Sequence, residues 1–221
     1  SSDFVPNKEP DVCPRGQRES LVNLDIDGPE VRALIQKAVK SGVAITSTLA
    51  VIEQLTPGRP VEDRVLEIMS PEVRESFLEA HELVQNAAAT SPLGMVWKNA
   101  LAFEKAFADA GGLLVAGVDP TGNGGAIPGF GDQRNFELLI EAGFTPEKAI
   151  EIMTANGAKV LGEFDRLGSV SPGKRADLVA IQGDPVSNPA DIRNVRIVFK
   201  DGVGYHAANL LDSVRESVGA R

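Results

Sequence analysis

The carboxylate of Asp119 is the side chain whose place in this sequence best suits it to chemistry. It follows the apolar run 111–118 and precedes the glycine-rich stretch 120–125. A short apolar run bounded by glycines is typical of a strand buried on both faces, as in parallel sheets. Catalytic groups of α/β proteins gather where such strands end. Asp119 is therefore either a catalytic group at a strand end or the first residue of a turn, because Asp before Pro commonly starts one.

Three other polar side chains could serve the same site. Thr48 lies near the end of a second β-branched run, 43–51, where it either faces a pocket or fills a strand. Asn123, set among glycines, would shape a substrate loop, since glycine lets backbone approach a ligand closely. Arg134 would either pair with a substrate carboxylate or lie on a solvated helix face.

Helices and strands alternate around these residues. Hydrophobic spacing and capping residues predict helices over 29–40, within 61–110 (one beginning at 70, another over 93–110), over 132–141 and from 146, and strands over 43–51 and 111–119. A helix followed by a strand is half of a β/α repeat, and this order occurs twice. The tail differs, because strands over 175–181 and 195–200 follow one another without a helix and predict a small antiparallel sheet. A last helix is expected over 207–218.

Composition narrows the classes of function. The 221 residues carry a net charge of −9, which argues against nucleic-acid binding, since phosphate contacts need clustered Lys and Arg. A single cysteine, Cys13, excludes an internal disulfide and a site built of several thiolates. No apolar run approaches the roughly 20 residues of a membrane span, so we expect neither a membrane nor a nucleic-acid partner.

Four segments of the chain resemble the amidohydrolase superfamily, in its imidazolonepropionase-like and prolidase-like branch. They read GAKVLG at 157–162, LGSVSPGKRADLV at 167–179, AGVDPTG at 116–122 and PGFGDQR at 128–134. The resemblance extends over about 29–205. It implies a hydrolase of C–N bonds in non-peptide amides, cyclic amides or dipeptides, acting on a small molecule and forming a homo-oligomer when intact.

The resemblance also implies a fold and a cofactor. The fold is an α/β (β/α)8 TIM barrel with a small β-sandwich built from both chain ends. Residues 1–165 would hold the last two barrel strands with their helices, and 166–221 the C-terminal sandwich strands and a terminal helix. In the family one or two divalent metals, usually zinc, activate a water. Asp119 matches the acidic residue that ends the eighth strand, where a carboxylate beside such a water accepts its proton.

The other metal ligands of the family have no match. The chain holds two histidines, His81 and His206, and no His-x-His pair. His81 falls in a helical stretch and His206 in the tail, so neither is expected to bind a metal. We therefore expect the C-terminal part of the barrel, inactive alone and prone to aggregate or oligomerise. Two alternatives stay open: a non-catalytic α/β module that binds a partner or assembles with a missing half, and a complete small α/β fold that uses Asp119 and Asp132 as an acid/base pair.

Overall fold

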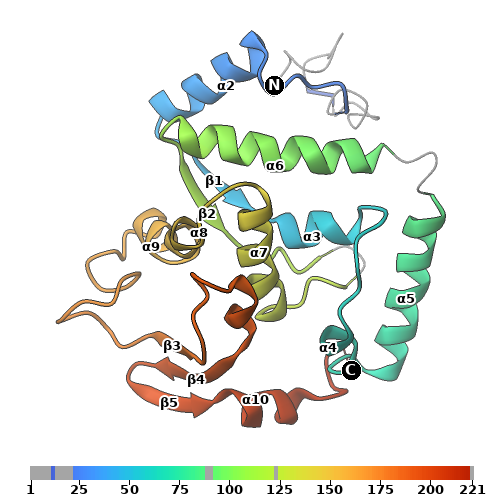
Figure 1. The fold of residues 1–221 in the computed structure, drawn as a ribbon, viewed down its shortest axis with the longest axis vertical. Coiled ribbons are helices and arrows are strands. Elements are labelled where there is room, and N and C mark those ends of the chain that lie inside the picture. Colours follow the sequence, from blue (N-terminus) through green and yellow to red (C-terminus); the bar gives the residue numbers. More distant parts are fainter. Residues whose placement is uncertain (1–10, 13–21, 88–91, 122–123, 220–221) are drawn as a thin grey trace.

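The computed structural model describes residues 11–12, 22–87, 92–121 and 124–219. The helices are α2 Pro29–Lys40, α3 Leu49–Gln54, α4 Asp63–Leu66, α5 Pro71–Asn86, α6 Leu93–Asp109, α7 Phe130–Glu141, α8 Pro146–Met153, α9 Ala155–Val160, the 3₁₀ helix η2 Pro189–Arg193 and α10 Ala207–Val214. The strands are β1 Ala44–Ser47, β2 Leu113–Ala116, β3 Leu178–Ile181, β4 Val195–Lys200 and β5 Val203–His206. Figure 1 shows their arrangement.

A pair of parallel strands lies at the centre of the larger part of the molecule. β1 and β2 pair in register, with Ser47 opposite Ala116, and the chain crosses between them through α3 to α6. α2 and α6 lie on one side of the strands, and α7, α8 and α9 lie on the other (Figure 1). Both strands end at the same edge, so the segments that follow them begin side by side.

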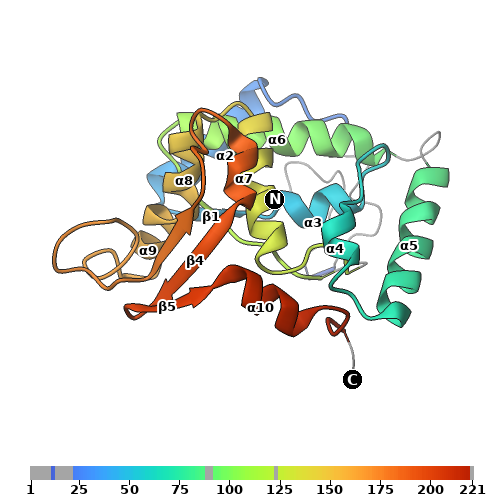
Figure 2. The ribbon, with the colours of Figure 1, turned by 60° about the horizontal axis from the view of Figure 1, so that its bottom comes forward.

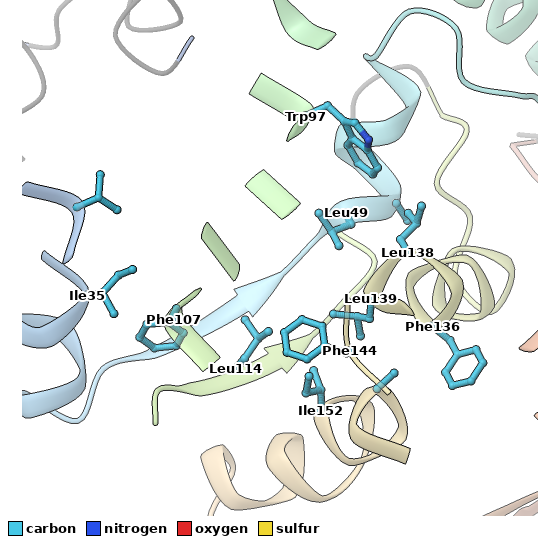
Figure 3. Packing of buried hydrophobic residues seen from close by; sticks show 13 residues of the cluster. Ile35, Leu49, Trp97, Phe107, Leu114, Phe136, Leu138, Leu139, Phe144 and Ile152 are labelled. Atoms are coloured by element: carbon cyan, nitrogen blue, oxygen red, sulfur yellow. The ribbon is translucent and has the colours of Figure 1, made fainter. Parts of the chain in front are cut away.

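The main hydrophobic core surrounds β2. Leu114 is 1% exposed and lies among Phe107 of α6, Phe144 between α7 and α8, and Ile152 of α8 (Figure 3). The backbone at Gly112, just before β2, passes close to the Phe107 ring, because a Cβ on Gly112 would lie 2.4 Å from that ring. Glycine at this position therefore lets the strand enter directly beneath an aromatic ring.

A second sheet is formed by the tail. β3, β4 and β5 are antiparallel neighbours in that order, and together with α10 they form the side of the molecule opposite α2 and α6 (Figure 2). No residue of these three strands is buried, whereas Ser47, Leu114 and Val115 of the parallel pair are. In the described residues both sheets are open, and neither closes into a barrel or packs against another sheet.

Most of the expected elements are present. The helix over 29–40 and the strand over 195–200 are confirmed at both ends. The strand expected over 43–51 is wrong in its second half, because it stops at Ser47 and α3 begins at Leu49. Leu49, Ala50 and Val51 are buried, and apolar residues serve a buried short helix as well as a buried strand. The sequence did not predict β5.

In the described ranges no helix is both long and apolar enough to cross a membrane.

Candidate functional site

Asp119 lies exposed beyond the end of β2. Its backbone takes the left-handed conformation, with φ of 48°, which Asp tolerates better than most residues. Thr121 folds back onto it, its amide donating to the Asp119 carbonyl at 2.6 Å and its hydroxyl to Oδ1 at 3.3 Å. The residue before it is held, since Val118 is 8% exposed and packs against Val51 and Ala126. The result is a solvent-facing carboxylate on an anchored backbone.

Thr48 follows β1 at the same edge of the sheet. It is the N-cap residue of α3, half-buried, and its hydroxyl makes no capping bond. The last backbone bond between the two strands joins Gly117 N to Ser47 O at 2.9 Å. Beyond it, Asn135 of α7 donates from Nδ2 to Gly117 O at 2.6 Å and accepts from Ala50 N at 2.7 Å. The two strand ends that carry Thr48 and Asp119 are thus joined by one side chain.

Arg134 is engaged by two carboxylates. Its Nε and NH2 donate to the two oxygens of Glu53 at 2.8 Å each, and NH1 donates to Glu137 at 2.6 Å. The hydrogen bonds that Arg134 donates to Glu53 raise the pKa of Arg134 above its ordinary value, against the effect of burial. Glu53 is 2% exposed and also binds Arg59, so the fork that would hold a substrate carboxylate is occupied by a buried partner.

The remaining candidates are spread over the molecule. Asn123 lies outside the described residues. Asp132 accepts from Gly129 N at 2.8 Å and so caps α7. His81 of α5 faces the Phe77 ring at 6.2 Å between centroids, and His206 ends β5. Among the residues that the structure describes, no three His, Cys, Asp or Glu side chains come together in a way that fits a metal ion.

A buried carboxyl lies behind the strand ends. Glu104 of α6 is 7% exposed, and burial raises its pKa to about 7. The Ser47 hydroxyl of β1, 0% exposed, lies beside it and favours its charged form. The contact falls short of a well-formed hydrogen bond, since neither Ser47 Oγ nor Glu104 Oε2 has a partner. This acid therefore comes from α6 and lies beside Ser47, the last residue of β1.

Sequence reasoning missed Asn135, Glu53 and Glu104. Two of them carry a signal in helical spacing: Asn135 lies three and four residues before the buried Leu138 and Leu139, and Glu104 lies three before Phe107. A polar residue on the apolar face of a helix must find a buried partner or lose its charge. The partners of Asn135 are two backbone groups, Ala50 N and Gly117 O, which lie far from it in the sequence. This pattern could not predict them.

Comparison with known proteins decides the family. The amidohydrolase family model matches residues 22–204. The chain belongs to the amidohydrolase family. The superfamily expected from the sequence is thereby confirmed. A 40-residue stretch is 50% identical to an imidazolonepropionase of Porphyromonas gingivalis, which supports the expected branch.

Solved structures of this family share the fold. Bottromycin amidohydrolase superposes with a TM-score of 0.62 at 22% identity, covering 90% of this chain and 46% of the other. A putative prolidase from Bifidobacterium longum gives a TM-score of 0.55 at 21% identity, covering 85% and 43%. The matched stretch of the imidazolonepropionase is 18% of this chain and 10% of that protein. The chain therefore spans less than half the length of these amidohydrolases.

Proposed function

We propose that this chain supplies the C-terminal part of a hydrolase of C–N bonds, with Asp119 as the proton acceptor. The observation that carries the proposal is the place of Asp119, exposed just beyond the end of the parallel strand β2 in an amidohydrolase-family chain. Asp119 accepts a proton from the water that attacks the carbonyl carbon. It then gives this proton to the nitrogen as the C–N bond breaks, so that its carboxylate is restored.

Thr48 and Asn123 would contact the small-molecule substrate. Thr48 is the better supported of the two, because it follows β1 at the edge where Asp119 follows β2. Arg134 would bind a substrate carboxylate only by exchanging Glu53 or Glu137 for it. We keep it as a substrate-binding candidate whose ion pairs would have to rearrange.

A divalent metal such as zinc, in one or two copies, is part of this proposal. The described residues do not fit such an ion by themselves, since they bring no three ligands together, and Asp119 would be one ligand among others from elsewhere. We assign no step to the metal. The closed TIM barrel, the division into 1–165 and 166–221, the composite β-sandwich and a homo-oligomer of the intact enzyme belong to the same proposal. Its corollary is that the 221 residues alone are inactive.

The test compares two proteins, the 221-residue chain and the natural protein that contains it, each assayed with added Zn²⁺. The substrates are Xaa-Pro dipeptides, N-acyl amino acids and cyclic amides, and the readout is the released amine. We expect hydrolysis only by the natural protein, and a loss of about 10²- to 10⁴-fold in kcat on Asp119→Asn. Hydrolysis by the isolated chain would contradict the proposal that it is inactive alone. An unchanged rate in D119N would remove Asp119 from the mechanism.

A matched control is Asp109→Asn. Asp109 is exposed at the end of α6 and pairs with Lys105, so its replacement removes a carboxylate without touching the strand ends. The unburied strands β3 to β5 favour one alternative, a non-catalytic module that assembles with another protein. That reading predicts a stable complex in which D119N and D109N behave alike.

A further inference from the structure

The carboxamide of Asn135 is a fully enclosed polar side chain near the candidate site. The residue is 0% exposed, and both ends of its amide bind backbone. Nδ2 donates to the Gly117 carbonyl, two residues before Asp119, and Oδ1 accepts from the Ala50 amide, two residues after Thr48. One side chain therefore fixes the spacing of the two segments that leave the parallel strands.

The carboxamide takes the place of a missing backbone rung. The ladder of β1 and β2 ends at the bond from Gly117 N to Ser47 O, because the chain turns into α3 after Thr48. Gly117 O is then left without a strand partner, and Ala50 N is among the first amides of α3, which have no partner within the helix. A side-chain amide offers one donor group and one acceptor, as a peptide does, and so satisfies both.

Apolar packing holds the same segment from its other side. Val118 is buried against Val51 and Ala126, and a Cβ on Gly131 would lie 2.6 Å from Val118 Cγ1. Gly131 and Asn135 lie four residues apart on α7, so one face of this helix presses on both Gly117 and Val118. Asp119 itself is free to face solvent while the two residues before it are fixed.

We propose that Asn135 is the positioning residue for Asp119, holding the carboxylate at the place where it must meet the attacking water. The inference rests on the proposed role of Asp119, but its structural half stands alone. A carboxylate that must accept a proton from one water has to stay within hydrogen-bond reach of it, and an error of about 1 Å is enough to cost a large part of the rate.

The chain offers a matched control for this role. Asn156 of α9 is also buried, at 5% exposed, and its Nδ2 donates at 2.9 Å to Leu114 O, earlier in the same strand. Asn135→Asp and Asn156→Asp each replace a donor to a backbone carbonyl by a nearly isosteric acceptor, the first just after β2 and the second within it. Only the first change touches the strand end that carries Asp119.

The structural test is amide hydrogen exchange on the 221-residue chain. In N135D we expect the amide of Gly117 to exchange about tenfold faster or more than in wild type, since the donor to Gly117 O is lost and two acceptors face each other, whereas Ala50 N keeps a carboxylate oxygen as its acceptor. N156D should leave these two amides within about twofold of wild type. Acid should reverse the effect in N135D, because a protonated carboxyl again donates to Gly117 O.

The functional test uses the natural protein that contains this chain, assayed with Zn²⁺. We expect N135D to lower kcat with little change in KM, and to regain part of the rate at acidic pH relative to wild type. Unchanged exchange at Gly117, or the same change in N156D, would overturn the proposal. So would altered exchange in N135D with an unaltered kcat, which would make Asn135 structural only.

Failure of the proposed function would give a different result from failure of the positioning role of Asn135. A wild-type protein that hydrolyses none of the substrates refutes that function, while exchange at Gly117 still decides whether Asn135 holds the segment. If N135D does not fold, the side-chain amide protons of Asn135 in wild type provide the second measurement. They should be protected from exchange, and free exchange of these protons would contradict the bond to Gly117.

Discussion

The two sheets of this molecule are stabilised in opposite ways. In the parallel pair, Ser47, Leu114 and Val115 are buried, and helices cover both sides. In the antiparallel sheet no strand residue is buried, and Val179, Val203 and Tyr205 are exposed by about half. The first sheet places its ends by packing and by an enclosed amide. The second depends on its own ladder and on polar contacts at the surface.

Arg193 links the two regions. It lies in η2, next to β4, and its guanidinium binds Glu137 of α7 at 2.6 Å and Glu62 at 2.6 Å. Glu137 also binds Arg134, which in turn binds Glu53, so the ion pairs continue to the buried side of α3. The difference between the sheets is therefore one of burial. The tail is attached to the larger part by these ion pairs, by backbone bonds of Val218 to Ile68 and Ser70, and by packing of Ile192 and Val218.

The largest expected difference comes from matched phenylalanines. Phe107→Ala, in the core beside Leu114, should lower the free energy of unfolding by about 3 to 5 kcal/mol, because it removes a fully buried ring. Phe199→Ala in β4, where the ring is half-buried over Gly204, should cost about 1 to 2 kcal/mol. Urea unfolding of both variants measures the two values, and equal losses would refute the contrast between the sheets.

Glu104 should make the parallel region sensitive to pH. Its pKa is about 7 in the folded protein against an ordinary value of 4.5, so the folded state binds the proton more tightly than the unfolded chain does. The free energy of unfolding therefore falls as pH rises from about 4.5 to about 7, and it changes no further from this source above that. Glu104→Gln removes the buried charge and should stabilise the protein by about 3 kcal/mol at pH 8, from a pKa raised to about 7.

At pH 4 the same variant should have almost the stability of wild type, because the carboxyl is protonated there in both states. Glu79→Gln, on the exposed face of α5, provides the control for a Glu-to-Gln change at the surface. Thermal or urea unfolding of the three proteins at pH 4, 6 and 8 measures the effect. A gain from E104Q that is the same at all three values would show that Glu104 does not titrate in this range.

Arg193→Met should loosen the link between the regions. It leaves Glu137 and Glu62 without this partner, and we expect a loss of about 1 kcal/mol, kept small by the partial exposure of the guanidinium and by solvent screening. The loss should shrink in 0.5–1 M salt, where the Debye length is only a few ångströms. A loss of the same size at all salt concentrations would assign the role of Arg193 to its packing instead.

The sequence predicted the periodic elements and not the long-range polar contacts. Residues 29–40 carry an apolar stripe, Pro at the first helical position and a glycine after the end, all local signals, and the helix has those ends. The run 43–51 has no such signal at Ser47, where the strand stops. There α3 begins, packs into the core and is capped by Asn135, which lies far along the chain. The position of Asp119 was readable from its own strand. The Asn135 side chain that holds the preceding backbone lies on α7, and its contact with Gly117 could not be predicted from the sequence.

The smallest expected effect concerns Asp177, in the part of the tail that carries the family resemblance. Its carboxylate accepts from Asp201 N at 2.7 Å, Lys200 Nζ at 2.8 Å and Arg175 NH2 at 2.5 Å, and these contacts hold its pKa well below the usual range. The backbone bond ties the turn between β4 and β5 to the start of β3. Because the carboxylate lies at the surface and is partly exposed, we expect Asp177→Asn to change global stability little.

The local effect of that change should still be measurable. The Asp201 amide should exchange faster in D177N than in wild type, whereas Asp184→Asn, which alters a turn held by Ser187 and Val186, should leave it unchanged. In wild type the contribution of Asp177 is present above its unfolded pKa of about 3.9 and is lost as the pH falls through the lower folded value. If D177N instead unfolded the tail and the parallel region together, the two sheets would form one cooperative unit, and their contrast would be one of exposure and not of independence.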